Sequence, residues 1–89
     1  MIAIQVSLYP VGQEDFIKPL NTFWKALKDK NINHKITPLS TITWDEDEDM
    51  LYNAIFEAYR KARKAGPAVM VTTVTTGDKD RIDELLNFL

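Results

Sequence analysis

The stretch that decides the fold lies in the middle of the chain and reads Asn33-His34-Lys35-Ile36-Thr37-Pro38-Leu39-Ser40-Thr41-Ile42-Thr43-Trp44. Its two arms, from His34 to Thr37 and from Thr41 to Trp44, are rich in residues that favour strands. Between them, Pro38 has no N–H to donate to a β ladder, so the chain bends or breaks there. The stretch therefore predicts a β-hairpin.

Two helical patterns flank this hairpin. The first runs to about Lys30, with Asp15 as its predicted cap and Asn31 as a left-handed stop. The second spans about Glu48 to Ala65 and ends at Gly66-Pro67. Apolar residues recur at helical spacing in both patterns: Phe16, Leu20, Phe23, Trp24 and Leu27 in the first, and Leu51, Ala54, Ile55, Ala58, Ala62 and Ala65 in the second.

Strand patterns lie outside the two helices. Near the N-terminus, Ile2, Ile4, Val6 and Leu8 alternate with more polar residues, which is typical of a strand with one apolar face. The segment 68–76 is almost entirely β-branched and apolar on both faces near its start, so it predicts a central strand buried on both sides. A final helix is expected from about Lys79 to Leu89.

The order of these elements is β-α-β-β-α-β followed by a short C-terminal helix. This order predicts a single α+β domain over residues 1–89 with the ferredoxin-like, split-βαβ arrangement. Helices are expected on one face of the sheet, leaving Ser7, Tyr9 and several threonines on the open face. Because a chain this short has a thin stability margin, we expect it to form a homo-oligomer.

Composition excludes several function classes. The net charge of −2 and the pI of about 5.3 argue against nucleic-acid binding, which needs a basic surface. The absence of cysteine excludes disulfides and cysteine-ligated metals. The first residues do not form a signal peptide and no apolar run is long enough for a membrane span, so the expected location is the cytoplasm.

Five consecutive acidic residues, Asp45-Glu46-Asp47-Glu48-Asp49, raise the question of a metal site. A calcium loop needs spaced ligands and a glycine at its turn, and this run has neither. The run immediately precedes a predicted helix, where carboxylates cap free N–H groups and complement the helix dipole. We therefore predict a helix cap and no metal.

No catalytic constellation emerges from the sequence. The single histidine, His34, lies in a polar stretch without an identifiable partner, and the three glycines, Gly12, Gly66 and Gly77, are scattered at predicted turns. The expectation is a protein that is not an enzyme and needs no cofactor. A stripe on the second helix, Tyr52, Phe56 and Tyr59, is open to three interpretations: a subunit contact, a pocket wall or peripheral core packing.

Small-molecule binding remains. A pocket combines apolar walls with a few placed polar groups, and the hairpin residues Pro38, Leu39, Ser40 and Thr41 offer hydroxyls beside a proline bend. For any one threonine, the competing explanation is that threonine simply favours strands. The candidate hydroxyl ligands are Ser7, Ser40, Thr41, Thr43 and Thr73, and the candidate walls are Tyr9, Trp44 and Phe56.

Several pieces of the chain, taken in order, resemble the small thiamine-binding, YkoF-like family. They are Pro10-Val11-Gly12 after the first strand, Ala26-Leu27-Lys28 at the end of a helix, Thr37-Pro38-Leu39-Ser40-Thr41 in the hairpin, Ala54, Ala58 and Ala62 before Ala65-Gly66, and a last strand rich in valine and threonine. The similarity covers almost the whole chain. Each piece is weak alone, and their order and spacing carry the resemblance.

This resemblance implies a ferredoxin-like domain that pairs its sheets into dimers and often tetramers. The expected partner is therefore another copy of the chain, in a homodimer or homotetramer that forms through the open face of the sheet. It also implies binding of thiamine or its hydroxymethylpyrimidine part without catalysis, with Pro38 to Thr41 at the family's hairpin site and Ser7 on the adjoining strand. The chain departs from the family in having Ser40 and Asp45 where glycines are frequent, and Asn31 in place of a glycine after the first helix. The alternative function is a structural or regulatory oligomerisation module with no small ligand.

Overall fold

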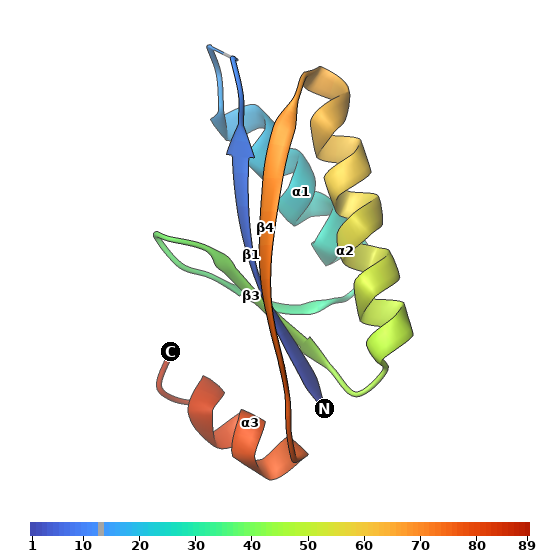
Figure 1. Ribbon diagram of the computed structural model, residues 1–89, viewed down its shortest axis with the longest axis vertical. Coiled ribbons are helices and arrows are strands. Elements are labelled where there is room, and N and C mark those ends of the chain that lie inside the picture. The colour runs from blue at the N-terminus through green and yellow to red at the C-terminus, as the bar shows by residue number, and fades with distance from the viewer. Residues whose placement is uncertain (13) are drawn as a thin grey trace.

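The computed structural model describes residues 1–12 and 14–89 and confirms the ferredoxin-like arrangement. Its sheet has four strands in the order β2-β3-β1-β4, all paired antiparallel, with α1 and α2 packed on one side (Figure 1). The elements are β1 (Ile2–Pro10), α1 (Ile17–Asp29), β2 (Asn33–Ile36), β3 (Thr41–Asp45), α2 (Glu48–Ala62), the 3-10 turn η1 (Arg63–Ala65), β4 (Ala68–Thr76) and α3 (Lys79–Leu86).

The core lies between β1 and the two long helices. Alternate residues of β1, from Ile2 to Leu8, are buried, as the period-two pattern predicted. They pack against buried residues that include Phe23 and Leu27 of α1 and Leu51 of α2. The helical stripes that face this core are therefore those identified from spacing.

Local signals place the ends of α1 close to the predicted positions. The Asp15 carboxylate accepts hydrogen bonds from the backbone N–H groups of Ile17 at 3.0 Å and Lys18 at 3.2 Å. At the other end, Asn31 adopts the left-handed conformation with φ of 55°. The backbone N–H of Ile32 then reaches back to the carbonyl of Leu27 at 3.0 Å, which closes the helix before the hairpin begins.

The acidic run caps α2, as predicted. The Asp47 carboxylate accepts a hydrogen bond from the Met50 N–H at 3.0 Å, and the Asp45 carboxylate accepts one from the Asp47 N–H at 2.8 Å. Within residues 1–12 and 14–89, no group of three or more histidine or carboxylate side chains is arranged to hold a metal ion. These carboxylates are thus engaged with the backbone at a helix start.

The prediction that 68–76 forms a central strand is wrong. This segment is β4, an edge strand whose one partner within the described sheet is β1, in a register from Ile2 opposite Thr76 to Pro10 opposite Ala68. From Val71 onward every residue of β4 is exposed. A β-branched run signals a strand but not its place in the sheet, because threonine and valine suit edges as well as centres.

The C-terminal helix α3 lies apart from α1 and α2, at the opposite end of the molecule from the C-terminal end of β1 (Figure 1). It is shorter than predicted. Ile82 is its buried anchor, and the Lys35 ammonium of β2 donates to the carbonyl of Leu86 at 3.3 Å. Lys35 lies opposite Ile42 on the face away from α1 and α2, so α3 reaches part of the face that was expected to be open. Among the described helices, none is long and apolar enough to cross a membrane.

Candidate ligand-binding pocket

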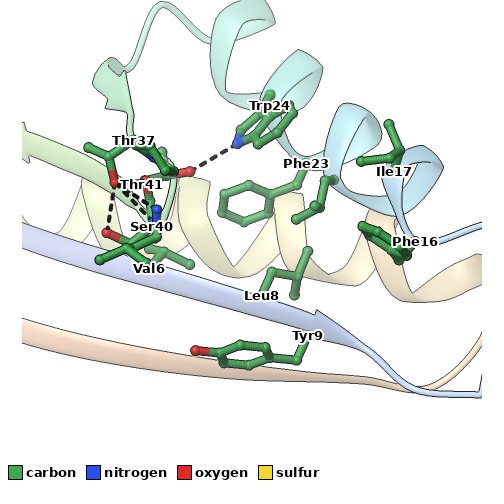
Figure 2. Close-up of a pocket in the computed structure, with 13 residues that line it drawn as sticks. Val6, Leu8, Tyr9, Phe16, Ile17, Phe23, Trp24, Thr37, Ser40 and Thr41 are labelled. Atoms are coloured by element: carbon green, nitrogen blue, oxygen red, sulfur yellow. Dashed lines mark hydrogen bonds between the residues drawn. The ribbon is translucent and has the colours of Figure 1, made fainter.

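A pocket of about 390 Å³ lies between the first half of α1, the end of β1 and the turn of the hairpin (Figure 2). It is on the helix side of the sheet, not on the open face. The residues that line it are Val6, Leu8, Tyr9, Phe16, Ile17, Leu20, Phe23, Trp24, Thr37, Pro38, Leu39, Ser40 and Thr41.

The floor and walls of this pocket are apolar. Val6 and Leu8 from β1 and Phe23 from α1 are buried and form part of the hydrophobic core. Phe16 and Leu39, by contrast, remain 56% and 86% exposed and border the opening. The pocket is therefore a recess in the core that opens between the start of α1 and the hairpin turn.

The hairpin turn is organised by the Thr37 hydroxyl. Its oxygen donates to the Ser40 carbonyl at 2.9 Å and accepts from the backbone N–H of Ser40 at 3.0 Å and of Leu39 at 3.3 Å. The Thr37 N–H also donates to the Ser40 carbonyl at 2.8 Å. Because these bonds close the turn that Pro38 interrupts, the side chains of Leu39 and Ser40 are presented from a defined backbone.

Thr41 is held from the other side by α1. The Trp24 indole Nε1–H donates to the Thr41 hydroxyl oxygen at 2.9 Å, as Figure 2 shows. This contact joins α1 to the hairpin across the pocket and leaves the hydroxyl hydrogen of Thr41 to donate elsewhere. Ser40 Oγ lies 3.5 Å from Thr37 Oγ1, at the limit of a hydrogen bond, so its hydrogen-bonding capacity is also largely unused.

The polar groups of the pocket are thus neutral and gathered at one end. Among the described lining residues there is no carboxylate, lysine, arginine or histidine. Such a site suits an uncharged, flat ring whose polar edge meets the hydroxyls of Ser40 and Thr41 while its faces contact aromatic carbon.

The structure brings together five of the eight ligand-binding residues expected from the sequence. Tyr9, Pro38, Leu39, Ser40 and Thr41 line the pocket, whereas Ser7, Thr43 and Thr73 do not. The Thr43 hydroxyl is buried and donates to the carbonyl of Ile4 at 2.9 Å. Ser7 and Thr73 lie on the face away from α1 and α2, opposite Val71 and Gln5 respectively.

The expected aromatic walls are not the observed ones. Trp44 borders a polar hollow near α3, and Phe56 lines a separate groove on α2. Although Tyr9 is one of the lining residues, its ring lies on the opposite side of β1 from Leu8 and does not form a wall of the pocket (Figure 2). The aromatic walls are Phe23 and Trp24 of α1 and Phe16, the residue that immediately precedes this helix.

Sequence reasoning placed these aromatics in the apolar stripe of the first predicted helix and did not identify them as walls of the pocket. One signal was present, since Phe23 and Trp24 are adjacent and neighbouring helical residues point in different directions. Phe23 is fully buried, whereas Trp24 is half-buried and needs a partner for its N–H.

A second hollow, of about 350 Å³, lies between α2 and β4. We call it the α2–β4 groove; its lining residues are Ile4, Tyr52, Asn53, Ile55, Phe56, Arg60, Met70 and Thr72. Of the three aromatic residues in the stripe of α2, Tyr52 and Phe56 line this groove and Tyr59 does not. Tyr52 and Phe56 are exposed along the groove, while Tyr59 packs on the core and donates to the Ala68 carbonyl at 2.7 Å.

Similar folds occur in solved structures. A Streptococcus pneumoniae protein superimposes with a TM-score of 0.83 at 22% identity, with 97% of each chain covered. A hypothetical protein of Methanocaldococcus jannaschii gives 0.80 at 16% identity, covering 99% of this chain and 97% of that one. A Thermotoga maritima protein proposed to act in thiamine biosynthesis or salvage gives 0.74 at 9% identity, covering 94% of this chain and 97% of that one.

These structural similarities establish the fold, and the sequence itself establishes the family. No curated protein matches the chain significantly. The family model described as the YkoF-related family matches residues 1–79, which span β1 through β4 and include every residue of the pocket. The chain therefore belongs to the YkoF-related family.

Proposed function

We propose that this protein binds thiamine or its hydroxymethylpyrimidine part, without catalysis, in the pocket between α1 and the hairpin. The observation that carries the proposal is the position of two hydroxyls with unused hydrogen-bonding capacity, on Ser40 and Thr41, beside an aromatic wall in a recess without charged lining residues. The cytoplasm is the expected setting.

An aminopyrimidine matches this arrangement chemically. Its ring nitrogens accept hydrogen bonds and its exocyclic amino group donates them, and a hydroxyl can serve either role. The flat ring fits against Phe23 and Trp24, and the cationic thiazolium of thiamine would extend toward the opening, where Phe16 offers an aromatic face. The hydroxyl end of the pocket would therefore select the pyrimidine.

Two further facts support the proposal. The chain belongs to the YkoF-related family, and the structurally similar Thermotoga maritima protein is proposed to act in thiamine biosynthesis or salvage. The described lining also lacks the paired acid and base that hydrolysis or group transfer requires, which favours binding alone.

The test uses tryptophan fluorescence. The chain has two tryptophans, and Trp24 borders the pocket while Trp44 lies elsewhere, so Trp44→Phe leaves one reporter at the site. Thiamine and free hydroxymethylpyrimidine are titrated separately into this variant, and the melting temperature is followed in parallel. We expect saturable quenching and a raised melting temperature with both compounds.

A matched control separates binding from nonspecific quenching. In Trp24→Phe the remaining reporter is Trp44, whose fluorescence should not respond, although the melting temperature should still rise if the pocket is filled. The proposal would be refuted if neither the fluorescence nor the melting temperature of Trp44→Phe changed at millimolar concentrations of both compounds.

A second candidate function is an oligomerisation module without a small ligand, using the face of the sheet away from α1 and α2. Tyr9, Val69 and Val71 are each about half exposed on this face (54%, 51% and 51%), at the end that α3 does not reach. It predicts that Val71→Lys lowers the mass measured by light scattering while the pocket stays empty at every thiamine concentration.

A further inference from the structure

The α2–β4 groove contains a cation that the proposed function does not use. Arg60 is exposed near the end of α2 and lines the groove, and its guanidinium lies over the Phe56 ring, 4.8 Å from the ring centre. Among the residues that the structure describes, no ion pair involves Arg60. A guanidinium that stacks on an aromatic face keeps the N–H groups at its edge for another acceptor. The groove therefore holds a positioned cation without a carboxylate partner.

The rest of the groove does not neutralise this cation. Its described lining residues include no carboxylate. On the α1 side of the same helix, Glu57 is engaged by Lys30 and Lys61. Although the whole chain has a net charge of −2, the groove is thus locally positive. Its charge is complementary to an anion.

The walls of the groove suit a flat ring. Ile4 and Ile55 are buried residues of its lining, whereas Tyr52 and Phe56 are 47% and 45% exposed along it. Met70 lines the groove from β4, and thioethers and aromatic rings both make favourable contacts with the ring of a ligand. Figure 1 shows α2 running beside β4, which is the edge strand of the described sheet, so a small molecule can enter from the outer side.

A second polar side chain lies at a fixed distance from the cation. Asn53 also lines the groove and precedes Arg60 by seven positions. Seven residues are close to two helical turns, so the two side chains leave α2 on the same side, about 10.5 Å apart along its axis. This separation suits one aromatic ring with a polar group at each end. The volume of about 350 Å³ also fits a small compound, since it lies near the lower end of the range for ligand pockets.

The charges of α2 set the direction in which such a ligand would lie. The first turn of the helix is acidic, with Glu48 and Asp49, and its last turn is basic, with Arg60 and Lys61. An anionic group is repelled at the end of the groove that Asn53 occupies and attracted at the end that Arg60 occupies. The Asn53 amide, which can both donate and accept, is left for an uncharged polar group.

We propose that the α2–β4 groove is a second ligand site, which binds a planar, single-ring aromatic molecule with an anionic group at one end and an uncharged polar group at the other. The ring lies against Phe56 and Met70, the anionic group accepts hydrogen bonds from Arg60, and the opposite group meets Asn53. A carboxylate and a phosphate share this chemistry. The site goes beyond the pocket between α1 and the hairpin, whose polar groups are neutral and whose ligand carries no anion.

The test is a titration of the wild-type protein followed by heteronuclear NMR. The probe is para-hydroxybenzoate, and para-hydroxybenzamide is its neutral control of nearly the same shape. We expect saturable shifts of the backbone amides from Asn53 to Arg60 and from Met70 to Thr72, with those from Leu39 to Thr41 unchanged. The neutral compound should bind at least about tenfold more weakly, because it offers no charge to the guanidinium.

Variants of α2 separate a specific contact from general attraction by positive charge. Arg60→Gln should weaken the binding of para-hydroxybenzoate about tenfold, because a charge-assisted hydrogen bond is lost. Lys61→Gln removes the same charge from the same turn but does not line the groove, so it is the matched control and should bind like the wild type. Arg60→Lys keeps the charge without the planar fork and should give an intermediate affinity. The same spectra show whether each variant is folded.

A comparison of benzoate with phenyl phosphate distinguishes the two sources of the anion, since neither has a para hydroxyl group. Tighter binding of either one at the groove would support the site and assign it to carboxylates or to phosphates. The proposal would be overturned if neither anion gave saturable shifts at millimolar concentrations, if the neutral amide bound as tightly as para-hydroxybenzoate, or if the shifts were confined to residues Leu39 to Thr41. Thiamine binding to Arg60→Gln should match that of the wild type, so the pocket is tested separately.

Discussion

The two hollows on the helix side of the sheet are similar in size, at about 390 and 350 Å³, and both have aromatic walls from a helix. They differ in what borders the sheet beside them. Next to α1, the β2–β3 hairpin turns back toward the helix and brings the hydroxyls of Thr37, Ser40 and Thr41 to the pocket. Next to α2, β4 ends the sheet, and the α2–β4 groove continues to an unpaired strand edge.

This difference indicates that the element next to a hollow, a hairpin or a strand edge, determines which kind of ligand or partner the hollow suits. A hairpin supplies a few fixed hydrogen-bonding groups, which suit the polar edge of a small molecule. An unpaired edge supplies a long row of backbone groups, which suits another strand. Two hollows with comparable apolar walls thus differ in the polar groups that lie beside them.

The largest expected effect is on stability, and it distinguishes Phe23, which is buried at the floor of the pocket, from Phe56, which is exposed at the wall of the α2–β4 groove. Phe23→Ala should lower the free energy of unfolding by about 3–5 kcal/mol, because a buried ring leaves a cavity. Phe56→Ala in the groove should cost less than about 1 kcal/mol, since that ring is 45% exposed. Urea unfolding of both variants checks this, and equal losses would contradict the comparison.

The next effect concerns the contact between α1 and the hairpin. Thr41→Val removes the acceptor of the Trp24 indole N–H and the hydroxyl offered to a ligand. We expect a loss of about 1–3 kcal/mol in stability and a roughly tenfold weaker affinity for hydroxymethylpyrimidine. Thr72→Val makes the same chemical change in the groove and should leave that affinity unchanged. If both variants weakened binding equally, the ligand would not bind beside the hairpin.

A smaller effect separates the two hydroxyls of the turn. Thr37→Val deletes the oxygen that closes the turn and should cost about 1 kcal/mol of stability. Ser40→Ala should change stability by no more than about 0.5 kcal/mol and yet weaken ligand binding, because the Ser40 hydroxyl is largely free in the empty pocket. Thermal unfolding and ligand titration of both variants measure this. If Ser40→Ala lost stability and Thr37→Val lost only affinity, Ser40 would close the turn and Thr37 would bind the ligand.

The smallest effect lies between the two hollows, where Lys30 at the end of α1 meets Glu57 of α2. The hydrogen bond from Lys30 lowers the pKa of the Glu57 carboxyl below its ordinary value. The pair therefore stabilises the fold above the ordinary glutamate pKa, and this contribution is lost as the pH falls through the lowered value. Because both side chains are exposed, the effect is small.

Lys30→Met tests this pair, with Lys18→Met as a control on the same helix. Between pH 7 and pH 3, the urea midpoint of Lys30→Met should fall less than that of the wild type, while Lys18→Met should follow the wild type. Indistinguishable acid dependence of all three proteins would show that the pair contributes nothing to holding α1 against α2.

Much of the fold could be predicted because its determinants are local. The alternation from Ile2 to Leu8, the Asp15 and Asp47 caps, and the left-handed Asn31 each act within a few residues, and the structure confirms all of them. The wall of the pocket could not be predicted in this way. Whether Trp24 faces the core or a recess depends on a hairpin that begins several residues later in the chain.

The sequence by itself determined the elements, their order and the bend at Pro38, because propensity, spacing and capping are properties of short segments. The tertiary structure alone decided which strand became an edge and which hydroxyls became available. β4 has the composition of a buried strand, yet the sheet order leaves it exposed, and Thr41 and Thr43, two residues apart on one strand, have different roles. The reason is that burial and hydrogen-bond partners depend on which elements pack together. Thr43 donates to the carbonyl of Ile4, whereas Thr41 accepts from Trp24 and borders a cavity.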